Sequence, residues 1–407
     1  MITCYLDSQD YSVLTDPKTL TAERVQMRNT LCRFANERKV QFVFSATSVC
    51  ESVSLTPHSS HLSELKAELL SELCGTNALI SFDRLIEQEA IALSGRCDRV
   101  CNIIDIYGNW FPDISVNKTI ETSWEKIRHL AEIDLRAIGL SRQQRRAQVR
   151  KLLKNGGPRG DFKRLIQLQG STTLALGLAE RYPMKPENAE IMARYFLGRG
   201  SEEEFTDALI ENLRDPRWMM KWFSTNHTLS SPIAEIVRKP GRELGENLRK
   251  LAALSIQMAS SFSDSDADSD PLGKRGTVTL QWNELQNKLL TGVIKRIASV
   301  HNLSLAEIAA DDVDKYCPGL STTIRSLYSS VWENVAGGRM EQPSNSQPVD
   351  AMHAMYAPYV RIFRADRFMA PHVQKHVTKH GTIVVSRLSN LVRTLELEIE
   401  REAGKHD

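Results

Sequence analysis

The sequence predicts an α/β domain whose parallel sheet is formed by both ends of the chain, with a mostly α-helical domain inserted between them. In residues 1–95, short β-branched or aromatic runs alternate with helical patterns, the order typical of a parallel sheet. The same alternation returns in residues 346–407, whereas helix-like segments dominate residues 96–345. We therefore expect a sheet domain comprising residues 1–95 and 346–407 and an inserted domain comprising residues 96–345.

Each expected element follows from its local pattern. Runs of β-branched, aromatic and aliphatic residues predict strands at 2–6, 40–44, 78–82, 359–363 and 382–385. Apolar residues at helical spacing predict helices at 21–38, 61–73, 350–356, 367–377 and from about 388 onward. In the middle, the helical patterns cover 122–139, 142–154, 172–182, 186–197, 202–213, 231–238, 243–262, 282–301 and 321–335. Loops are expected at 260–275 and 337–348, which are rich in Ser, Asp, Gly and Pro.

Composition limits the class of protein. Hydrophobic residues make up 41% and charged residues 25% of the 407 positions, which is ordinary globular usage and excludes wholesale disorder. The sequence contains no apolar run of about 18 residues and no basic segment leading an apolar one at its start, so we expect neither a membrane span nor a signal peptide. Seven cysteines, an odd number, favour reduced thiols and a cytoplasmic location.

Four acids stand where a parallel sheet would gather them. Asp7 and Asp366 directly follow predicted strands, Glu51 lies beyond the second strand, and Asp350 lies in the first turn of a helix. Ligands of open α/β sheets bind beyond the carboxyl ends of the strands. Neighbouring carboxylates repel one another unless a cation neutralises them, and Mg²⁺ or Mn²⁺ is the natural cation for oxygen ligands. Taken singly, each aspartate could instead be a helix cap.

Five sets of residues at the two chain ends form a pattern of their own: Tyr5–Gln9, Phe42–Ser45 with Glu51, Asp350–Val360, Phe363–Met369 and Gly381–Ser386. Together they resemble the PIN nuclease superfamily. The resemblance covers the two ends and implies a three-layer α/β/α domain that cleaves RNA, or in some relatives DNA flaps, with Mg²⁺ or Mn²⁺. It also implies that Asp7, Glu51, Asp350 and Asp366 are the catalytic and metal-binding acids. Ser8 or Gln9 would be the small polar residue near the first acid. An insertion of about 250 residues departs from the usual size of such domains.

His353 lies three residues after Asp350, so both are on one face of the predicted helix. We expect His353 to hydrogen-bond a carboxylate of the metal site or a phosphate. The alternative is a partly buried histidine that is satisfied by the backbone.

A basic segment in the middle is a candidate nucleic-acid contact. Between Arg142 and Arg164 there are nine basic residues and one acid, and the net charge of the whole chain is only +2. Lysine and arginine bind phosphates with a salt-dependent affinity. The residues expected to do so are Arg142, Arg145, Arg146, Arg150, Lys151 and Lys154. A solvated helix face is the alternative.

Two other patterns fail as metal sites. Cys97 and Cys101 have no second pair to complete a zinc site. A calcium loop counted from Asp264 has Ser269 and Arg275 where Gly and Glu are required, which leaves an acidic loop.

These observations lead to two hypotheses of function. The first is a metal-dependent endonuclease that acts on RNA in preference to DNA and, by fold-level analogy, serves as a bacterial toxin or a phage-defence effector. The second is a catalytically inactive PIN-like scaffold that binds RNA or a protein through its helical insertion. A homodimer and an inhibitory or activating protein are the other partners considered, and no membrane partner is expected. An RNA-processing role stays open.

Overall fold

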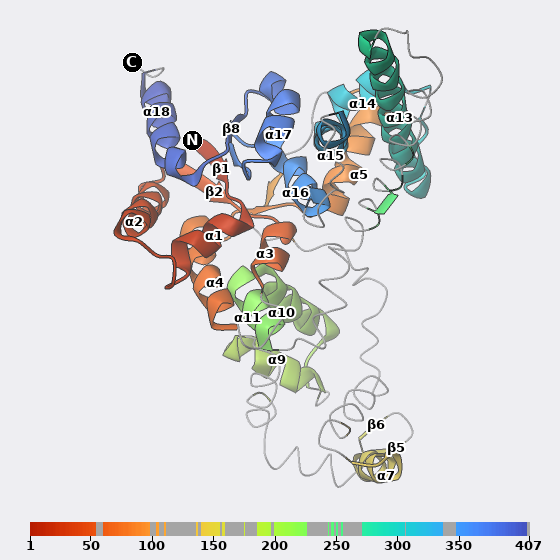
Figure 1. The fold of residues 1–407 in the computed structure, drawn as a ribbon. Coiled ribbons are helices and arrows are strands. Elements are labelled where there is room, and N and C mark those ends of the chain that lie inside the picture. The colour runs from red at the N-terminus through yellow and green to blue at the C-terminus, as the bar shows by residue number, and fades with distance from the viewer. Residues whose placement is uncertain are drawn as a thin grey trace. The chain divides into compact units, whose positions relative to one another are not determined.

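The computed structural model describes most of both chain ends and parts of the middle (Figure 1). The described stretches are residues 1–53, 60–97, 103–105, 140–154, 157–158, 185–196, 199–225, 271–305, 307–336 and 347–404, with single positions between them. The expected helices at 122–139, 172–182, 231–238 and 243–262 and the acidic segment 264–270 lie mostly or wholly outside the described residues.

A four-stranded parallel sheet is built from both ends of the chain. Its order is β2 (Val40–Val43), β1 (Ile2–Tyr5), β7 (Ile362–Arg364), β8 (Ile383–Val385). β1 pairs with β2 on one side and with β7 on the other, and every pair is parallel. The prediction of a mixed α/β fold with a parallel sheet is therefore confirmed, with strands from the two ends side by side.

The third expected strand is shorter than predicted. β3 (Ala78–Leu79) pairs antiparallel with β4 (Ile104–Asp105), a strand the sequence pattern did not indicate. Ala78 also forms a parallel bridge with Phe44, just after β2. Residue 82, which was included in the expected strand, instead begins a helix, because Ser81 ends the extended segment.

Helices follow each strand of the N-terminal part. They are α1 (Ser8–Thr15), α2 (Ala22–Asn36), α3 (Ala46–Ser52), α4 (Ser60–Cys74) and α5 (Phe82–Gly95). The expected helices at 21–38 and 61–73 correspond to α2 and α4, whereas α1, α3 and α5 were not predicted. The first two of these begin at side-chain caps, Asp7 and Ser45, directly after β1 and β2, so each strand leads at once into a helix.

The C-terminal part begins with an α-helix, α16 (Gln347–His353), that continues directly as a 3₁₀ helix, η2 (Ala354–Tyr359). The elements that follow are β7, α17 (Met369–Val377), η3 (Thr378–His380), β8, η4 (Leu388–Asn390) and α18 (Leu391–Ala403). α16 starts three residues before Asp350, inside the expected loop 337–348. The 3₁₀ turn contains Pro358, which cannot continue an α-helix.

The middle of the chain is largely helical where it is described. It contains α7 (Arg142–Leu152), the short strands β5 (Leu153–Lys154) and β6 (Gly157–Pro158), α9 (Pro186–Phe196), α10 (Glu202–Arg214), α11 (Pro216–Thr225), α13 (Pro271–Val300), α14 (Ala310–Tyr316) and α15 (Pro318–Ala336). The expected loop 260–275 is wrong from Pro271 onward, because α13 begins there. Proline suits the first position of a helix, where its missing N–H has no partner to lose.

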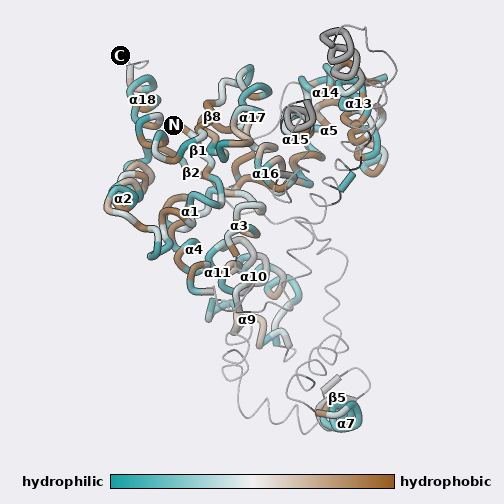
Figure 2. The backbone as a smooth tube through the Cα atoms, in the orientation of Figure 1, coloured by the Kyte–Doolittle hydropathy of each residue, from teal (hydrophilic) through white to brown (hydrophobic). Residues whose placement is uncertain are grey.

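The chain forms two compact units, residues 1–112 with 223–407 and residues 113–222. Helices α13, α14 and α15 belong to the first unit. They share a buried core with α5, α16 and α17, to which Leu93, Ala351 and Met369 contribute. Where α13 is coloured in Figure 2 it carries both brown and teal residues, as an amphipathic helix does. The expected insertion 96–345 and the compact unit 113–222 therefore overlap without coinciding.

A second core cluster joins the sheet to the C-terminal elements. It includes Tyr5 of β1, Val43 of β2, Phe363 of β7 and Tyr356 of η2. The rings of Tyr5 and Phe363 stack with centroids 5.3 Å apart.

None of the helices in the described part of the chain has the length and the apolar composition that a membrane-spanning helix needs.

Candidate functional site

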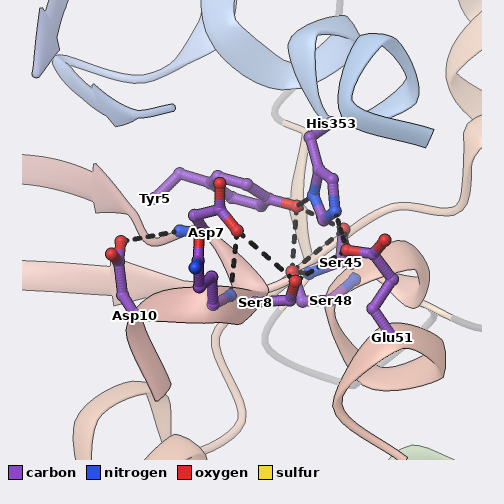
Figure 3. A network of polar contacts seen from close by, with 9 residues as sticks. Tyr5, Asp7, Ser8, Asp10, Ser45, Ser48, Glu51 and His353 are labelled. Carbon is purple, nitrogen blue, oxygen red and sulfur yellow. Dashed lines mark hydrogen bonds and ion pairs between the residues drawn. The ribbon is translucent and has the colours of Figure 1, made fainter. Parts of the chain in front are cut away.

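Asp7 lies just beyond the carboxyl end of β1 and caps α1. Its Oδ1 atom accepts a hydrogen bond of 2.9 Å from the backbone N–H of Gln9, and its own backbone N–H donates to Asp10 Oδ2 at 3.2 Å (Figure 3). The capping role that the sequence left open for Asp7 is therefore present. The carboxylate stays half-buried at the end of the strand, and the cap fixes its direction.

Glu51, in α3, is held by two side chains from other elements. Its Oε2 atom accepts a hydrogen bond of 2.7 Å from the hydroxyl of Ser8 and lies 2.6 Å from His353 Nε2 (Figure 3). Ser8 Oγ also lies 3.4 Å from Asp7 Oδ1. Ser8 and Gln9 were both candidates for the polar residue near the first acid. Ser8 contacts the acids with its side chain, whereas Gln9 is exposed and contributes its backbone N–H.

Tyr5 joins this group of side chains from the sheet. Its hydroxyl lies 2.5 Å from His353 Nδ1, 2.7 Å from Ser45 Oγ and 2.9 Å from Ser48 Oγ (Figure 3). Tyr5 is 0% exposed. Tyr5, Ser45 and Ser48 were not predicted as site residues. The available signal was a tyrosine within a strand expected to be buried, since a buried phenol needs a hydrogen-bond partner.

His353 makes one of the two kinds of contact expected of it, a hydrogen bond to a carboxylate. Burial disfavours the charged imidazolium, but the Tyr5 oxygen and the Glu51 carboxylate outweigh this effect and raise the pKa of His353. In the charged form, Nε2–H donates to Glu51 and Nδ1–H donates to Tyr5. The Tyr5 hydroxyl is then able to donate to one of the two serines. The imidazole ring thereby links β1, α3 and α16.

Asp350 of α16 lies in the electrostatic field of the other three acids. Burial, together with the negative charges of Asp366, Asp7 and Glu51, raises its pKa to about 7, with His353 opposing the shift. Asp366 follows β7, and its Oδ1 atom accepts a hydrogen bond of 2.6 Å from the N–H of Met369 at the start of α17. The other three acids that were predicted from the sequence are thus close enough to Asp350 to affect its pKa.

The four acids do not form a complete set of metal ligands in the described part of the chain. Within the part of the chain that is described, no three His, Cys, Asp or Glu side chains are close enough together to hold a metal ion. Glu51 is engaged by Ser8 and His353, and Asp7 and Asp366 are engaged by helix N–H groups. All four side chains offer carboxylate oxygens, the ligands that hard divalent cations prefer.

Behind the site, a buried ion pair fixes the start of α1 to the sheet. Arg364 Nη2 lies 2.9 Å from Asp10 Oδ1, and both side chains are almost fully buried. Burial raises the pKa of Asp10 to about 7 even though Arg364 opposes the shift. Arg364 Nη1 also donates to the Val385 carbonyl at 3.0 Å. The pair therefore connects α1 with β7 and β8 next to Asp7, and no pattern in the sequence indicated it.

The basic segment lies on α7, in the compact unit 113–222. Arg142, Arg146 and Arg150 are exposed, whereas Arg145 donates from Nη1 to the Leu140 carbonyl at 2.6 Å. Lys151 and Lys154 belong to α7 and β5, and their side chains lie outside the described part of the chain. Spacing by four residues places the three exposed arginines on one helix face.

Comparison of the chain with protein-family models, with curated proteins and with solved structures finds no match. The function proposed below therefore rests on the residues of the site and their chemistry.

Proposed function

We propose that the protein is a metal-dependent endonuclease of the PIN-like kind that acts on RNA in preference to DNA. The observation that carries the proposal is the placement of Asp7 and Asp366 directly beyond the neighbouring parallel strands β1 and β7, with the Ser8 hydroxyl lying between Asp7 and Glu51. The raised pKa of Asp350, to which Asp366, Asp7 and Glu51 contribute, agrees with it. Carboxylates that repel one another at the carboxyl edge of a parallel sheet are a site for a cation.

Mg²⁺ or Mn²⁺ would fit the donor chemistry, with Asp7, Glu51, Asp350 and Asp366 as the residues that hold it. A bound divalent ion neutralises these charges, polarises a phosphodiester and lowers the pKa of a bound water. Since no three of the acids stand within ligand distance in the described residues, some of these side chains must rotate toward the ion.

The chain's own residues position the acids. His353 and Ser8 hold the Glu51 carboxylate at 2.6 Å and 2.7 Å, and the Gln9 N–H holds Asp7. Hydrogen bonds of this kind orient metal ligands, and their removal commonly costs about 10- to 100-fold in metal affinity or activity. His353 is a positioning residue in this proposal, because it touches Glu51 and not the reacting phosphate.

The first experiment replaces Asp7 and Asp350, each by asparagine. We expect both variants to fold and to lose cleavage of labelled single-stranded RNA in Mg²⁺ or Mn²⁺. Mn²⁺ should raise the melting temperature of the wild type, because a ligand that binds the folded state stabilises it, and should not do so in Asp350→Asn. Glu396→Gln, an exposed carboxylate on α18, is the matched control and should behave as the wild type. Full cleavage by both asparagine variants would overturn the proposal.

A non-catalytic scaffold is the second candidate. The observation that favours it is that Asp7, Asp366 and Glu51 all have structural hydrogen-bond partners. The scaffold predicts no melting shift at millimolar Mn²⁺ and no cleavage, with RNA binding through α7 retained.

A toxin or phage-defence role is tested by expressing the wild type and Asp7→Asn in bacteria. Growth arrest and new RNA ends with the wild type alone would support this role, and normal growth with both would count against it.

A further inference from the structure

A pocket of about 830 Å³ lies among α13, α14, α15, α17 and η3, all within the first compact unit. None of the four acids of the candidate site lines it. A pocket of this size accommodates a small molecule. With the exception of Pro318, every residue that lines it is polar or charged, so the chemistry of the lining indicates a hydrophilic ligand.

One part of the lining is rigid and rich in donors. Arg325 binds Asp314 through Nε and Nη2, each at 2.6 Å, which neutralises that carboxylate. The same guanidinium donates to Gln286 Oε1 and Asn287 Oδ1, both at 3.2 Å. Gln286 Nε2 in turn donates to the Arg325 carbonyl at 3.5 Å, so Asn287 is the amide of this pair whose NH₂ group is offered to a ligand.

The wall formed by α17 and η3 is electropositive. Its cations are Lys375 and Lys379, and Lys379 Nζ donates one hydrogen bond to the Asp314 carbonyl at 3.2 Å. His376 and His380 also line it, and burial lowers the pKa of His380. Burial, together with the charges of Arg325, Lys375 and Lys379, lowers the pKa of His376 to about 4, against the opposing effect of Asp314. The buried Nε2 atom of His376 has no hydrogen-bond partner in the described part of the chain. The positive charges of Arg325, Lys375 and Lys379 therefore all affect His376, whose Nε2 atom is available to a ligand.

The part of the lining that comes from α14 contains an acceptor. Asp311, an exposed aspartate of α14, lines the pocket together with Ser321 and Thr322 of α15, whose side chains are buried, and the Ser321 hydroxyl donates to Asp314 Oδ1. A carboxylate accepts hydrogen bonds from hydroxyl groups, and lysines and an amide NH₂ donate to phosphate oxygens. The pocket therefore offers lysine donors and a carboxylate acceptor to the same ligand, which suits a molecule that carries both a phosphate and hydroxyl groups.

We propose that this pocket binds a sugar phosphate, with the phosphate against Lys375 and Lys379 and the sugar hydroxyls against Asp311. The same chemistry can come from a free sugar phosphate or from one ribose-phosphate unit of a nucleic acid. The proposal does not depend on the nuclease function, because the pocket shares no lining residue with the acids.

The experiment measures equilibrium binding to the full chain in EDTA, so that no cleavage occurs. The probes are ribose 5-phosphate and a labelled oligouridylate, with ribose and inorganic phosphate as comparison ligands. The main variant is Lys375→Met with Lys379→Met. Lys295→Met with Arg296→Met is the matched control, because both side chains are exposed on α13, outside the lining, and the charge change is the same.

We expect the lysine variant to bind at least one probe about tenfold or more weakly than the wild type and the control, since two charge-assisted hydrogen bonds are removed. If ribose 5-phosphate binds, Asp311→Leu should weaken it and leave inorganic phosphate unchanged, which identifies a free sugar phosphate as the source. If only the oligouridylate responds to the lysine variant, the nucleic-acid backbone is the source.

Three results would overturn the proposal. One is no binding of ribose 5-phosphate at millimolar concentration together with an unchanged RNA affinity in the lysine variant. Another is equal binding by the lysine variant and its control. The third is inorganic phosphate binding as tightly as ribose 5-phosphate, which would make the pocket a simple anion site. Melting curves of each variant without ligand establish that it is folded.

Discussion

The Tyr5 hydroxyl is the point at which the hydrogen bonds of the candidate site meet. It contacts His353, Ser45 and Ser48 within 2.9 Å, and His353 in turn contacts Glu51. Buried polar groups of this kind are stabilising only while every member has a partner, because an unpaired one keeps its full desolvation cost. A phenol at this position therefore determines whether the imidazole, and through it Glu51, stays in place.

Tyr5→Phe tests this role. We expect the free energy of unfolding to fall by about 2 kcal/mol, because His353 Nδ1 is left without its partner, and RNA cleavage to fall with it as Glu51 loses its orientation. The measurement is urea unfolding together with a cleavage assay.

Tyr11→Phe is the control for that substitution. Tyr11 is equally buried, but its hydroxyl contacts only Cys74 Sγ, at 3.5 Å, within the described part of the chain. The expected cost is under about 1 kcal/mol, with cleavage unchanged. Equal effects of the two substitutions would mean that the Tyr5 hydroxyl has no special role.

The acids of the site could be predicted from the sequence, but their partners could not. Asp7 and Asp366 follow runs of strand-forming residues, and the carboxyl ends of parallel strands share one edge, so their neighbourhood was predictable. The Tyr5–His353 contact joins positions 348 residues apart. Neither residue carries a local signal for the other, because their proximity depends on β1 and α16 having already packed. The Asp10–Arg364 pair was not predictable for the same reason.

At the scale of elements, a carboxylate of α5 caps the start of α15. Glu89 is 0% exposed and accepts hydrogen bonds from the N–H groups of Gly319 at 2.6 Å and Leu320 at 3.0 Å, and from the Tyr359 hydroxyl. The first N–H groups of a helix have no partner within the helix, so these two oxygens supply the acceptors that they need. A side-chain carbon on Gly319 would lie 2.6 Å from the Met355 carbonyl oxygen, so this close approach requires glycine.

The pH dependence of stability tests this cap. Burial raises the pKa of Glu89 from its ordinary 4.5 to about 7, although its three donors lower it. Between these two values the unfolded chain has released the proton that the folded chain keeps, so stability falls as the pH rises, by up to about 3 kcal/mol. Glu89→Gln cannot titrate and lacks this contribution. We therefore expect Glu89→Gln to be less stable than the wild type at pH 5, by about 2 kcal/mol, and the difference to shrink by pH 8.

Urea unfolding of both proteins at the two pH values measures this difference. A difference that grows with pH would mean that the carboxylate is charged and stabilising throughout, contrary to the expectation.

Two of the helices that were not predicted are short ones whose start depends on a capping side chain and on the strand before it. α1 and α3 have eight and seven residues, too few to show a helical period, and they begin at Asp7 and Ser45 directly after strands. The start of α13 was expected to be a loop, because its polar and glycine-containing residues outweighed the proline that opens it. β1 and β2, by contrast, consist of residues with strong strand preference and pair as expected.

At the scale of the whole molecule, the proposed chemistry and substrate binding belong to different compact units. We expect replacement of Arg142, Arg146 and Arg150 by alanine to weaken RNA binding and to reduce the dependence of log K on log salt by roughly 0.7 for each phosphate that is no longer neutralised. The Mn²⁺-dependent melting shift should be unchanged, because these arginines lie on α7 in the unit 113–222 and the acids lie in the other.

Arg145→Ala is the control on the same helix. Its side chain is half-buried and turned toward the Leu140 carbonyl, to which Nη1 donates, so its removal should change the salt slope less than removal of an exposed arginine does. A triple variant with an unaltered slope would return α7 to the role of a solvated helix face.

The central place of β1 in the sheet has a consequence for how the protein is made. The backbone N–H of Arg361 donates to Thr3 Oγ1 at 2.9 Å, across 358 positions of the chain. Closing so long a loop is slow compared with local folding, and during synthesis β1 emerges from the ribosome long before its neighbour β7. The first strand therefore remains with one edge unpaired until then. The site beyond it, which needs His353, Asp350 and Asp366, cannot assemble before these C-terminal elements have been synthesised, so a nascent chain that lacks them carries no finished site.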